Sequence, residues 1–232
     1  MRYFILFLII SIAASLSPNP AIKVLRIGFH HQDEVGLGAR GTWHAFVVSG
    51  PESYLKQVNV TVKAVNDPMD DDANSLNGRE VIADITPDPI LLVRGDVFQS
   101  GNVDALSWGP LEIPLGKTVT MGSAEFSLQI QDSTVEQRQR QYKFAVLLRV
   151  GGVEQVVAIY SAYSDVGADF IPAAERNPSL LWVGDLDGDE RVDFLLDTSD
   201  HYNVDEVTLF LSSRRSKGDL VKAVAFSRRV GC

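Results

Sequence analysis

Cysteine is almost absent from this sequence, which contains a single one, Cys232. A lone cysteine cannot form a bridge within the chain, so the fold does not depend on internal disulfides. Two interpretations of Cys232 stay open: a free thiol, or a thiol that pairs with a second chain. Basic residues are also scarce, with 21 Lys and Arg against 30 Asp and Glu. Because an acidic chain lacks the basic patches that neutralise phosphate, we expect neither nucleic acid nor an anionic membrane surface as a partner.

Long apolar runs are missing as well, and the N-terminal one covers only the stretch from Phe4 to Ala14. A helix needs roughly 20 apolar residues to cross a bilayer, so this run is too short for a membrane span. Arg2 precedes it and small or turn-forming residues follow, which is the layout of a secretory signal peptide. We therefore predict a cleaved signal peptide over residues 1–17 and a secreted or periplasmic protein with no stable membrane insertion.

Several catalytic motifs are absent too. The sequence has no G-x-S-x-G elbow, no H-E-x-x-H pair and no phosphate-binding glycine loop. A pair of catalytic carboxylates, however, leaves little trace in a sequence. The sequence therefore leaves enzyme activity open and favours a role without catalysis.

What the sequence does contain is apolar residues that recur mostly at every second position. Residues 58–64 and 124–130 alternate in this way, which predicts half-buried antiparallel strands. Gly151 and Gly152 separate two strand-like runs, 142–150 and 153–160, as is typical of a β-hairpin. Further strands are predicted at 22–29, 42–48, 80–85, 90–93, 181–183, 192–196, 207–211 and 221–226.

These short strands, with no long helix among them, predict an all-β fold: an antiparallel β-sandwich or an open barrel. The sequence shows no internal repeat of useful period. We predict an N-terminal β-region over residues 18–119 and a C-terminal β-region over residues 120–232. The second region contains a strand-loop-strand motif that carries the chemistry of the chain.

That motif is the segment Asp185-Leu-Asp-Gly-Asp-Glu-Arg-Val-Asp193, with acids at loop positions one, three, five and nine. Calcium binds six to eight oxygens at roughly 2.3–2.6 Å, and an acid at every second residue of a tight loop directs its oxygens inward. Position seven supplies a backbone carbonyl. We therefore predict a Ca²⁺ site formed by Asp185, Asp187, Asp189, Arg191 and Asp193.

The flanking residues are apolar and strand-like on both sides of this loop, from Leu180 to Val183 and from Phe194 to Leu196. The whole arrangement, over residues 180–197, resembles the FG-GAP and VCBS-type repeats, in which a strand, a D-x-D-G-D-G-x-x-D loop and a second strand bind calcium. Glu190 stands where those repeats have a glycine at positive φ, and we expect this substitution to cost roughly 1 kcal/mol. A single copy cannot build the multi-bladed propeller of that family.

The acidic segment has two other interpretations. An EF-hand requires a glutamate at position twelve and helical flanks, whereas Leu196 stands at that position between strand-like runs. An ordinary solvated acidic turn is the second interpretation, and the regular spacing of the acids argues against it.

Three weaker patterns are interpreted as having no functional site. Asp67 and the acids at 70–72 are interpreted as a solvated charge cluster. Adjacent side chains of a strand point to opposite faces, so we do not expect His30 and His31 to chelate one ion. Arg94-Gly95-Asp96 spells a tripeptide read by adhesion receptors, but its position after an apolar run predicts a turn that ends a strand.

The first functional hypothesis is a secreted or periplasmic calcium-binding β-protein with a binding or structural role. Its metal is structural rather than catalytic, and its candidate ligand is a protein or a glycan. The alternative is a secreted glycan- or peptide-hydrolase stabilised by calcium. A third hypothesis is a cell-surface adhesion or assembly component that dimerises through Cys232.

Overall fold

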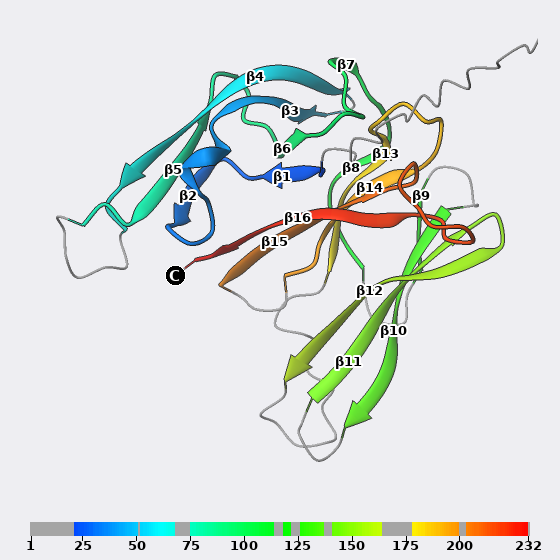
Figure 1. Cartoon of the computed structure of the whole chain (residues 1–232). Coiled ribbons are helices and arrows are strands. Elements are labelled where there is room, and N and C mark those ends of the chain that lie inside the picture. The colour runs from blue at the N-terminus through cyan, green and yellow to red at the C-terminus, as the bar shows by residue number, and fades with distance from the viewer. Residues whose placement is uncertain are drawn as a thin grey trace, which may run out of the picture.

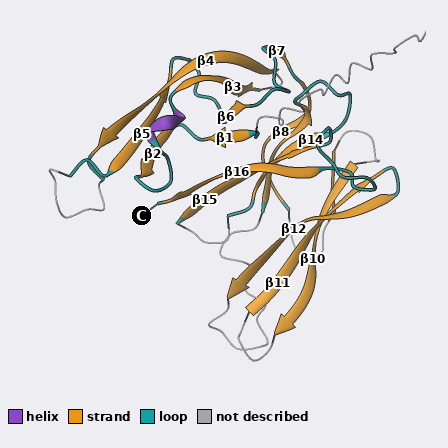
Figure 2. Cartoon of the chain, viewed as in Figure 1, coloured by secondary structure: helices purple, strands orange, loops and turns teal. Residues whose placement is uncertain are grey.

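The computed structural model describes residues 21–50, 52–67, 75–113, 118–121, 126–136, 141–163, 178–199 and 203–231. Within them the regular structure is strand, apart from one 3₁₀ turn, η1 (Leu37–Ala39) (Figure 2). The predicted all-β fold is therefore confirmed. The predicted signal peptide and Cys232 lie outside these ranges. None of the described residues belongs to a helix that is long and apolar enough to cross a membrane.

The strands of the described residues form three antiparallel sheets, arranged as layers in Figure 1. The N-terminal sheet, in the order β1-β6-β3-β4-β5-β2 with β7 added to β4, comprises β1 (Lys23–Leu25), β2 (Gly28–His31), β3 (Gly41–Ser49), β4 (Glu52–Val65), β5 (Gly78–Ala83), β6 (Leu91–Arg94) and β7 (Gly101–Asn102). The central sheet, in the order β16-β15-β14-β13-β8, comprises β8 (Asp104–Glu112), β13 (Ser179–Asp185), β14 (Asp193–Asp197), β15 (Val204–Leu211) and β16 (Lys222–Val230). The third sheet, in the order β12-β11-β10-β9, comprises β9 (Thr118–Met121), β10 (Phe126–Glu136), β11 (Gln141–Val150) and β12 (Val153–Tyr163).

The N-terminal sheet is strongly curled. Only Arg26 and Ile27 separate β1 from β2, yet these strands lie at opposite edges of the sheet. Because two residues span only about 7 Å, the sheet must bend until its two edges come close together. The prediction of one strand over 22–29 is therefore wrong. The strand is interrupted at Arg26 and Ile27, and Gly28, the first residue of β2, has a φ of 101°, in a region that favours glycine.

The central sheet is buried on both faces. Trp182, Leu195 and Leu209 pack against the N-terminal sheet, where the Trp182 ring meets Phe46 edge-on at 4.9 Å. On the opposite face, Phe194 stacks on a neighbouring phenylalanine at 4.5 Å and packs against the third sheet. Burial on two faces explains why β13 and β14 are continuous apolar runs rather than alternating ones. The acidic loop therefore joins two neighbouring strands of this sheet, β13 and β14, and every residue of β14 is buried.

The predicted hairpin at Gly151 and Gly152 is confirmed, with φ angles of 54° and 79° in the turn between β11 and β12. Strand β8 was not predicted, because Gly109 and Pro110 interrupt its pattern. A proline is tolerated there because β8 is an edge strand. This strand, which precedes residue 119, pairs with β13 of the central sheet. The division into regions 18–119 and 120–232 stays a prediction.

Candidate metal centre

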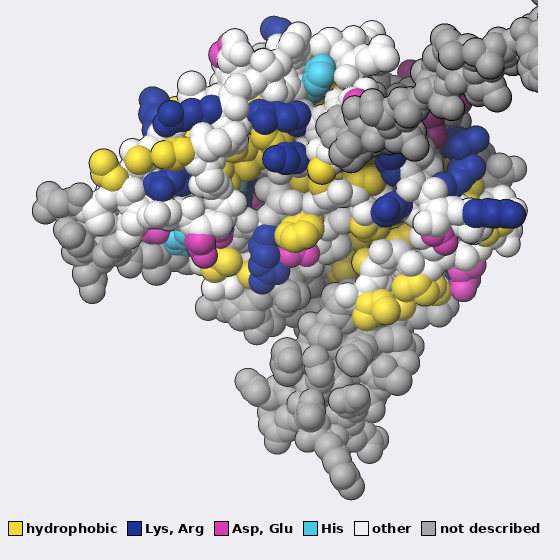
Figure 3. All heavy atoms as spheres, viewed as in Figure 1, with side chains coloured by type: hydrophobic (Ala, Val, Ile, Leu, Met, Phe, Trp, Pro, Cys, Tyr) yellow, Lys and Arg dark blue, Asp and Glu magenta, His cyan; other side chains and the backbone are white. Residues whose placement is uncertain are grey.

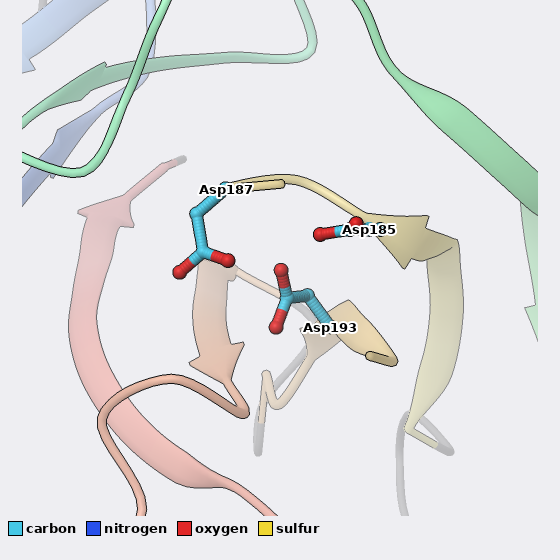
Figure 4. A group of neighbouring side chains, drawn as sticks. All are labelled: Asp185, Asp187 and Asp193. Atoms are coloured by element: carbon cyan, nitrogen blue, oxygen red, sulfur yellow. The ribbon is translucent and has the colours of Figure 1, made fainter. Parts of the chain in front are cut away.

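The acidic loop connects β13, which ends at Asp185, to β14, which begins at Asp193. Because Gly184 pairs directly with Asp193 in the antiparallel ladder, the first and last acids are held together by backbone hydrogen bonding. Figure 4 shows the carboxylates of Asp185, Asp187 and Asp193 turned toward one another. One oxygen of each lies within 4.8 Å of the other two. Three of the five predicted ligand residues therefore converge.

Asp185 closes the loop through its carboxylate. Its Oδ1 accepts hydrogen bonds from the N–H groups of Gly188 and Asp189, at 2.8 and 3.1 Å, and its Oδ2 accepts one from Glu190 at 2.8 Å. A loop that folds back this tightly on its first residue contains residues with positive φ: the angle is 79° at Gly188 and 62° at Glu190. The expectation that residue 190 occupies a position suited to glycine is thus confirmed, and Glu190 adopts this conformation at a local cost of roughly 1 kcal/mol.

Asp193 ties the loop to the next strands. Its side chain is fully buried, and it accepts hydrogen bonds from the N–H of Leu186 at 2.9 Å and the N–H of Ser212 at 2.8 Å. Burial raises the pKa of Asp193 to about 7, and the nearby charges of Asp187 and Asp189 act in the same direction. A buried carboxylate with this pKa is stabilised by a proton or by a cation.

Asp187 supplies the oxygen with the fewest partners. Its Oδ2 accepts a hydrogen bond from the hydroxyl of Ser213, whereas its Oδ1 is buried and has no hydrogen-bond partner. Burial raises the pKa of Asp187, and the charges of Asp189 and Asp185 also raise it. The loop thus holds a desolvated carboxylate oxygen beside two other acids, an arrangement that a divalent cation relieves.

The other two predicted ligand residues, Asp189 and Arg191, do not belong to the cluster of three carboxylates. The carboxylate of Asp189 accepts hydrogen bonds from the Ser212 hydroxyl at 2.8 and 2.9 Å and from the Arg191 N–H at 3.1 Å. The side chain of Arg191 is exposed, and its Nη1 lies 3.7 Å from Asp189 Oδ2. Asp189 therefore faces the turn after β15 rather than the cluster of three. The predicted carbonyl ligand at Arg191 stays a prediction.

Ser212 and Ser213 were not identified from the sequence. They follow β15, some twenty residues beyond the loop, and they hold Asp189 and Asp187 through their hydroxyl groups. No local pattern links two serines to acids so far along the chain. Only the pairing of β14 with β15 brings the two turns together.

A cavity of about 360 Å³ adjoins the loop. It is lined on one side by Asp185, Asp187 and Gly188 and on the other by residues 99–104, which lead from the N-terminal sheet into the central sheet. An ion site requires a route from solvent, and this cavity supplies one on the side of Asp187.

Two of the weaker sequence patterns, the acid Asp67 and the tripeptide Arg94-Gly95-Asp96, lie away from the acidic loop and make contacts of their own. The interpretation of Asp67 as a solvated acid is wrong: it is 7% exposed, and its Oδ2 lies 2.5 Å from His31 Nδ1. Residues 70–72 lie outside the described part of the chain. Arg94 ends β6 as predicted, and Asp96 pairs with Arg214 at 2.6 Å. The tripeptide therefore forms a turn at the end of β6, and its aspartate is paired with Arg214.

Comparison with family models, with curated proteins and with solved structures gave no match. The resemblance of the acidic loop to FG-GAP and VCBS-type repeats stays a prediction.

Proposed function

We propose that this chain is an extracytoplasmic β-protein in which the loop from Asp185 to Asp193 binds one calcium ion. The observation that carries the proposal is the convergence of Asp185, Asp187 and Asp193, with one oxygen from each within 4.8 Å of the others. The buried oxygen of Asp187 without a hydrogen bond adds to it. Calcium suits this donor set because it prefers oxygen ligands and fills incomplete coordination with water.

The ion has a structural role in this proposal. The three acids stand where β13 and β14 meet, and Asp193 also accepts a hydrogen bond from Ser212 after β15. A cation there stabilises the junction of three neighbouring strands of the central sheet. The protein then serves as a binding or structural module with a protein or glycan ligand. The alternative of a calcium-stabilised hydrolase stays a prediction, because no observation on the described residues favours it.

Export is the second part of the proposal, and it rests on the apolar run from Phe4 to Ala14 behind Arg2. Expression of the full chain with its leader, followed by mass measurement of the exported product, tests it. We expect a product that lacks about the first 17 residues. A product of full length that stays in the cytoplasm contradicts export and leaves the calcium site untouched.

Thermal unfolding with calcium and with a chelator tests the metal site. Calcium at about 100 times its dissociation constant adds roughly 2.7 kcal/mol of stability. For a chain of this size we expect a rise of about 5–10 °C in melting temperature. The double variant Asp185→Ala/Asp187→Ala abolishes this rise. Asp88→Ala, which removes an exposed acid between β5 and β6, retains it. Equal melting temperatures of the unaltered chain in calcium and chelator overturn the proposal.

A further inference from the structure

The C-terminal end of β16 is attached to the segment around β2 by two side chains. Glu34, in the turn after β2, accepts a hydrogen bond from the N–H of Val230 through its Oε1, at 2.6 Å. Arg229 donates through its Nη1 to the carbonyl of Ile27 at 3.0 Å. These bonds join residues that are 196 and 202 positions apart, so they hold the last strand against the first ones. This contact is called the β2–β16 junction below.

The imidazole of His30 is buried beside this junction and is 1% exposed. Its Nε2 lies 2.8 Å from the carbonyl oxygen of Arg26, so Nε2 carries a proton and donates it. Its Nδ1 is buried, has no hydrogen-bond partner and lies 3.7 Å from Oε2 of Glu34. Nδ1 therefore faces a carboxylate at a distance too long for a hydrogen bond.

A positive charge lies opposite His30 in the sheet. Arg79 pairs with His30 in the ladder between β2 and β5, so the two side chains share one face. Arg79 is 8% exposed, and its Nη1 donates to the carbonyls of Leu76 and Gly78, at 3.0 and 2.7 Å. Its Nε is buried without a partner, and none of the described carboxylates forms an ion pair with it. A second charge on this face, at His30, therefore meets no anion from β5.

Charged groups from the neighbouring elements also act on the ring. Burial lowers the pKa of His30 most, and the charge of Arg229 lowers it further. The hydrogen bond to the Arg26 carbonyl and the charges of Glu34 and Asp205 act in the opposite direction without reversing the shift. Arg229 and Asp205 are paired with each other across β15 and β16. The net result is a ring that is neutral at pH 7.

A cavity of about 380 Å³ adjoins the ring and is lined by His30 and Glu34. Two further charged residues line it, Asp33 and Arg228, and Arg228 pairs with Glu206 at 2.9 Å. Figure 3 shows acidic, basic and histidine side chains gathered near the C-terminal end of β16. The cavity gives water and protons a route to the buried ring.

A proton on Nδ1 turns this nitrogen of His30 into a donor. To form a charge-assisted hydrogen bond with it, Oε2 of Glu34 must approach by about 1 Å from its distance of 3.7 Å. Glu34 is fixed by the N–H groups of His31 and Val230, at 2.9 and 2.6 Å, so this movement weakens both bonds. The charged ring also lies opposite Arg79, which favours its exit from the buried face. Both effects loosen the junction.

We propose that protonation of His30 releases the end of β16 from the turn after β2, so that mild acid opens the β2–β16 junction. The direction follows from linkage. Because the pKa of His30 is lower in the closed junction than its ordinary value of 6.5, the open form binds protons more tightly and gains population as the pH falls below that value. His31 acts in the opposite direction, because its hydrogen bond to Asp67 raises its pKa and acid favours that pair. This response is separate from the calcium loop.

Amide hydrogen exchange of Val230, corrected for the intrinsic effect of pH, tests the proposal on the full mature chain. The reference is His30→Gln, whose side-chain amide still donates to the Arg26 carbonyl but does not titrate. We expect the protection of Val230 in the unaltered chain to fall, relative to this variant, at least about threefold from about pH 7.5 to about pH 5. His44→Gln, at a histidine of β3 whose pKa is also lowered by burial, behaves like the unaltered chain.

An NMR titration of the His30 ring keeps the test independent of whether His30→Gln folds. We expect a pKa below 6.5 in the unaltered chain and a still lower one in Glu34→Gln, because the carboxylate of Glu34 favours the charged ring. Two results overturn the proposal. One is a pKa of 6.5 or higher for His30, and the other is an equal pH dependence of Val230 protection in the unaltered chain and in His30→Gln.

Discussion

Two buried carboxylates, those of Asp67 and Asp193, are accommodated by this fold in different ways. Asp67 faces a base, with its Oδ2 2.5 Å from His31 Nδ1. Asp193 faces two backbone N–H groups and two further acids, and none of the described basic side chains forms an ion pair with it. The hydrogen bond that His31 donates to Asp67 raises the pKa of His31, whereas burial raises the pKa of Asp193 itself to about 7.

The difference concerns where the compensating charge comes from. Asp67 is paired with His31, a basic side chain that the chain itself provides. Asp193 has no such partner, so it is neutralised by a proton or by an ion from solution. The charge of Asp193 is therefore compensated from solution, whereas the charge of Asp67 is compensated by His31 within the chain.

The largest effect is expected from Asp193→Ala. This variant leaves the buried N–H groups of Leu186 and Ser212 without acceptors, and each unsatisfied group costs about 1–3 kcal/mol. We expect a loss of about 2–5 kcal/mol in urea unfolding with chelator present. Asp104→Ala, at an exposed residue of β8 that pairs with Asp185, changes stability by less than about 0.5 kcal/mol. Equal losses in the two variants contradict the role given to Asp193.

A smaller effect is expected from Asp67→Asn, which keeps the shape of the side chain and removes its charge. The charge-assisted hydrogen bond to His31 becomes an ordinary one, so we expect a loss of about 1–2 kcal/mol near pH 6. The pKa of His31 falls at the same time, which an NMR titration of the imidazole measures. An unchanged pKa shows that Asp67 is not the group that holds the proton on His31.

The same pair predicts a pH dependence. The pKa of His31 is higher in the folded chain than its ordinary value of 6.5. Its contribution to stability is therefore complete below that value and is lost as the pH rises through the raised folded pKa. The stability difference between the unaltered chain and Asp67→Asn is expected to shrink from about pH 6 to pH 9. A difference that grows over this range has the opposite sign and excludes the pair as its source.

The smallest effect is expected from Glu190→Gly. Glycine removes the strain that a side chain causes at a φ of 62°, but it also makes the unfolded chain more flexible. We expect a net gain of up to about 1 kcal/mol, seen as a slightly higher melting temperature. Gly188→Ala, at φ 79° in the same loop, is the matched change in the opposite direction and lowers stability. A loss in both variants means that Glu190 makes contacts that outweigh its strain.

The sequence predicts what is encoded locally. Two glycines between strand-like runs located the hairpin at Gly151 and Gly152, and regular spacing of acids located three carboxylates that meet. Longer-range pairing is beyond such patterns. Asp67 was assigned to solvent because its partner His31 is 36 residues away. The placing of β1 and β2 at opposite sheet edges depends on pairing with other strands, so no feature of residues 22–29 reveals it.

Isothermal titration of calcium into the metal-free mature chain at pH 7 tests most directly whether Asp193 requires a cation. We predict one ion per chain, with release of protons, because a carboxyl group with a pKa of about 7 is partly protonated at this pH. Repeating the titration in two buffers with different ionisation enthalpies measures that release. Asp185→Ala/Asp187→Ala gives no binding heat. Absence of calcium uptake by the unaltered chain, or uptake that the double variant retains, contradicts a calcium site at this loop.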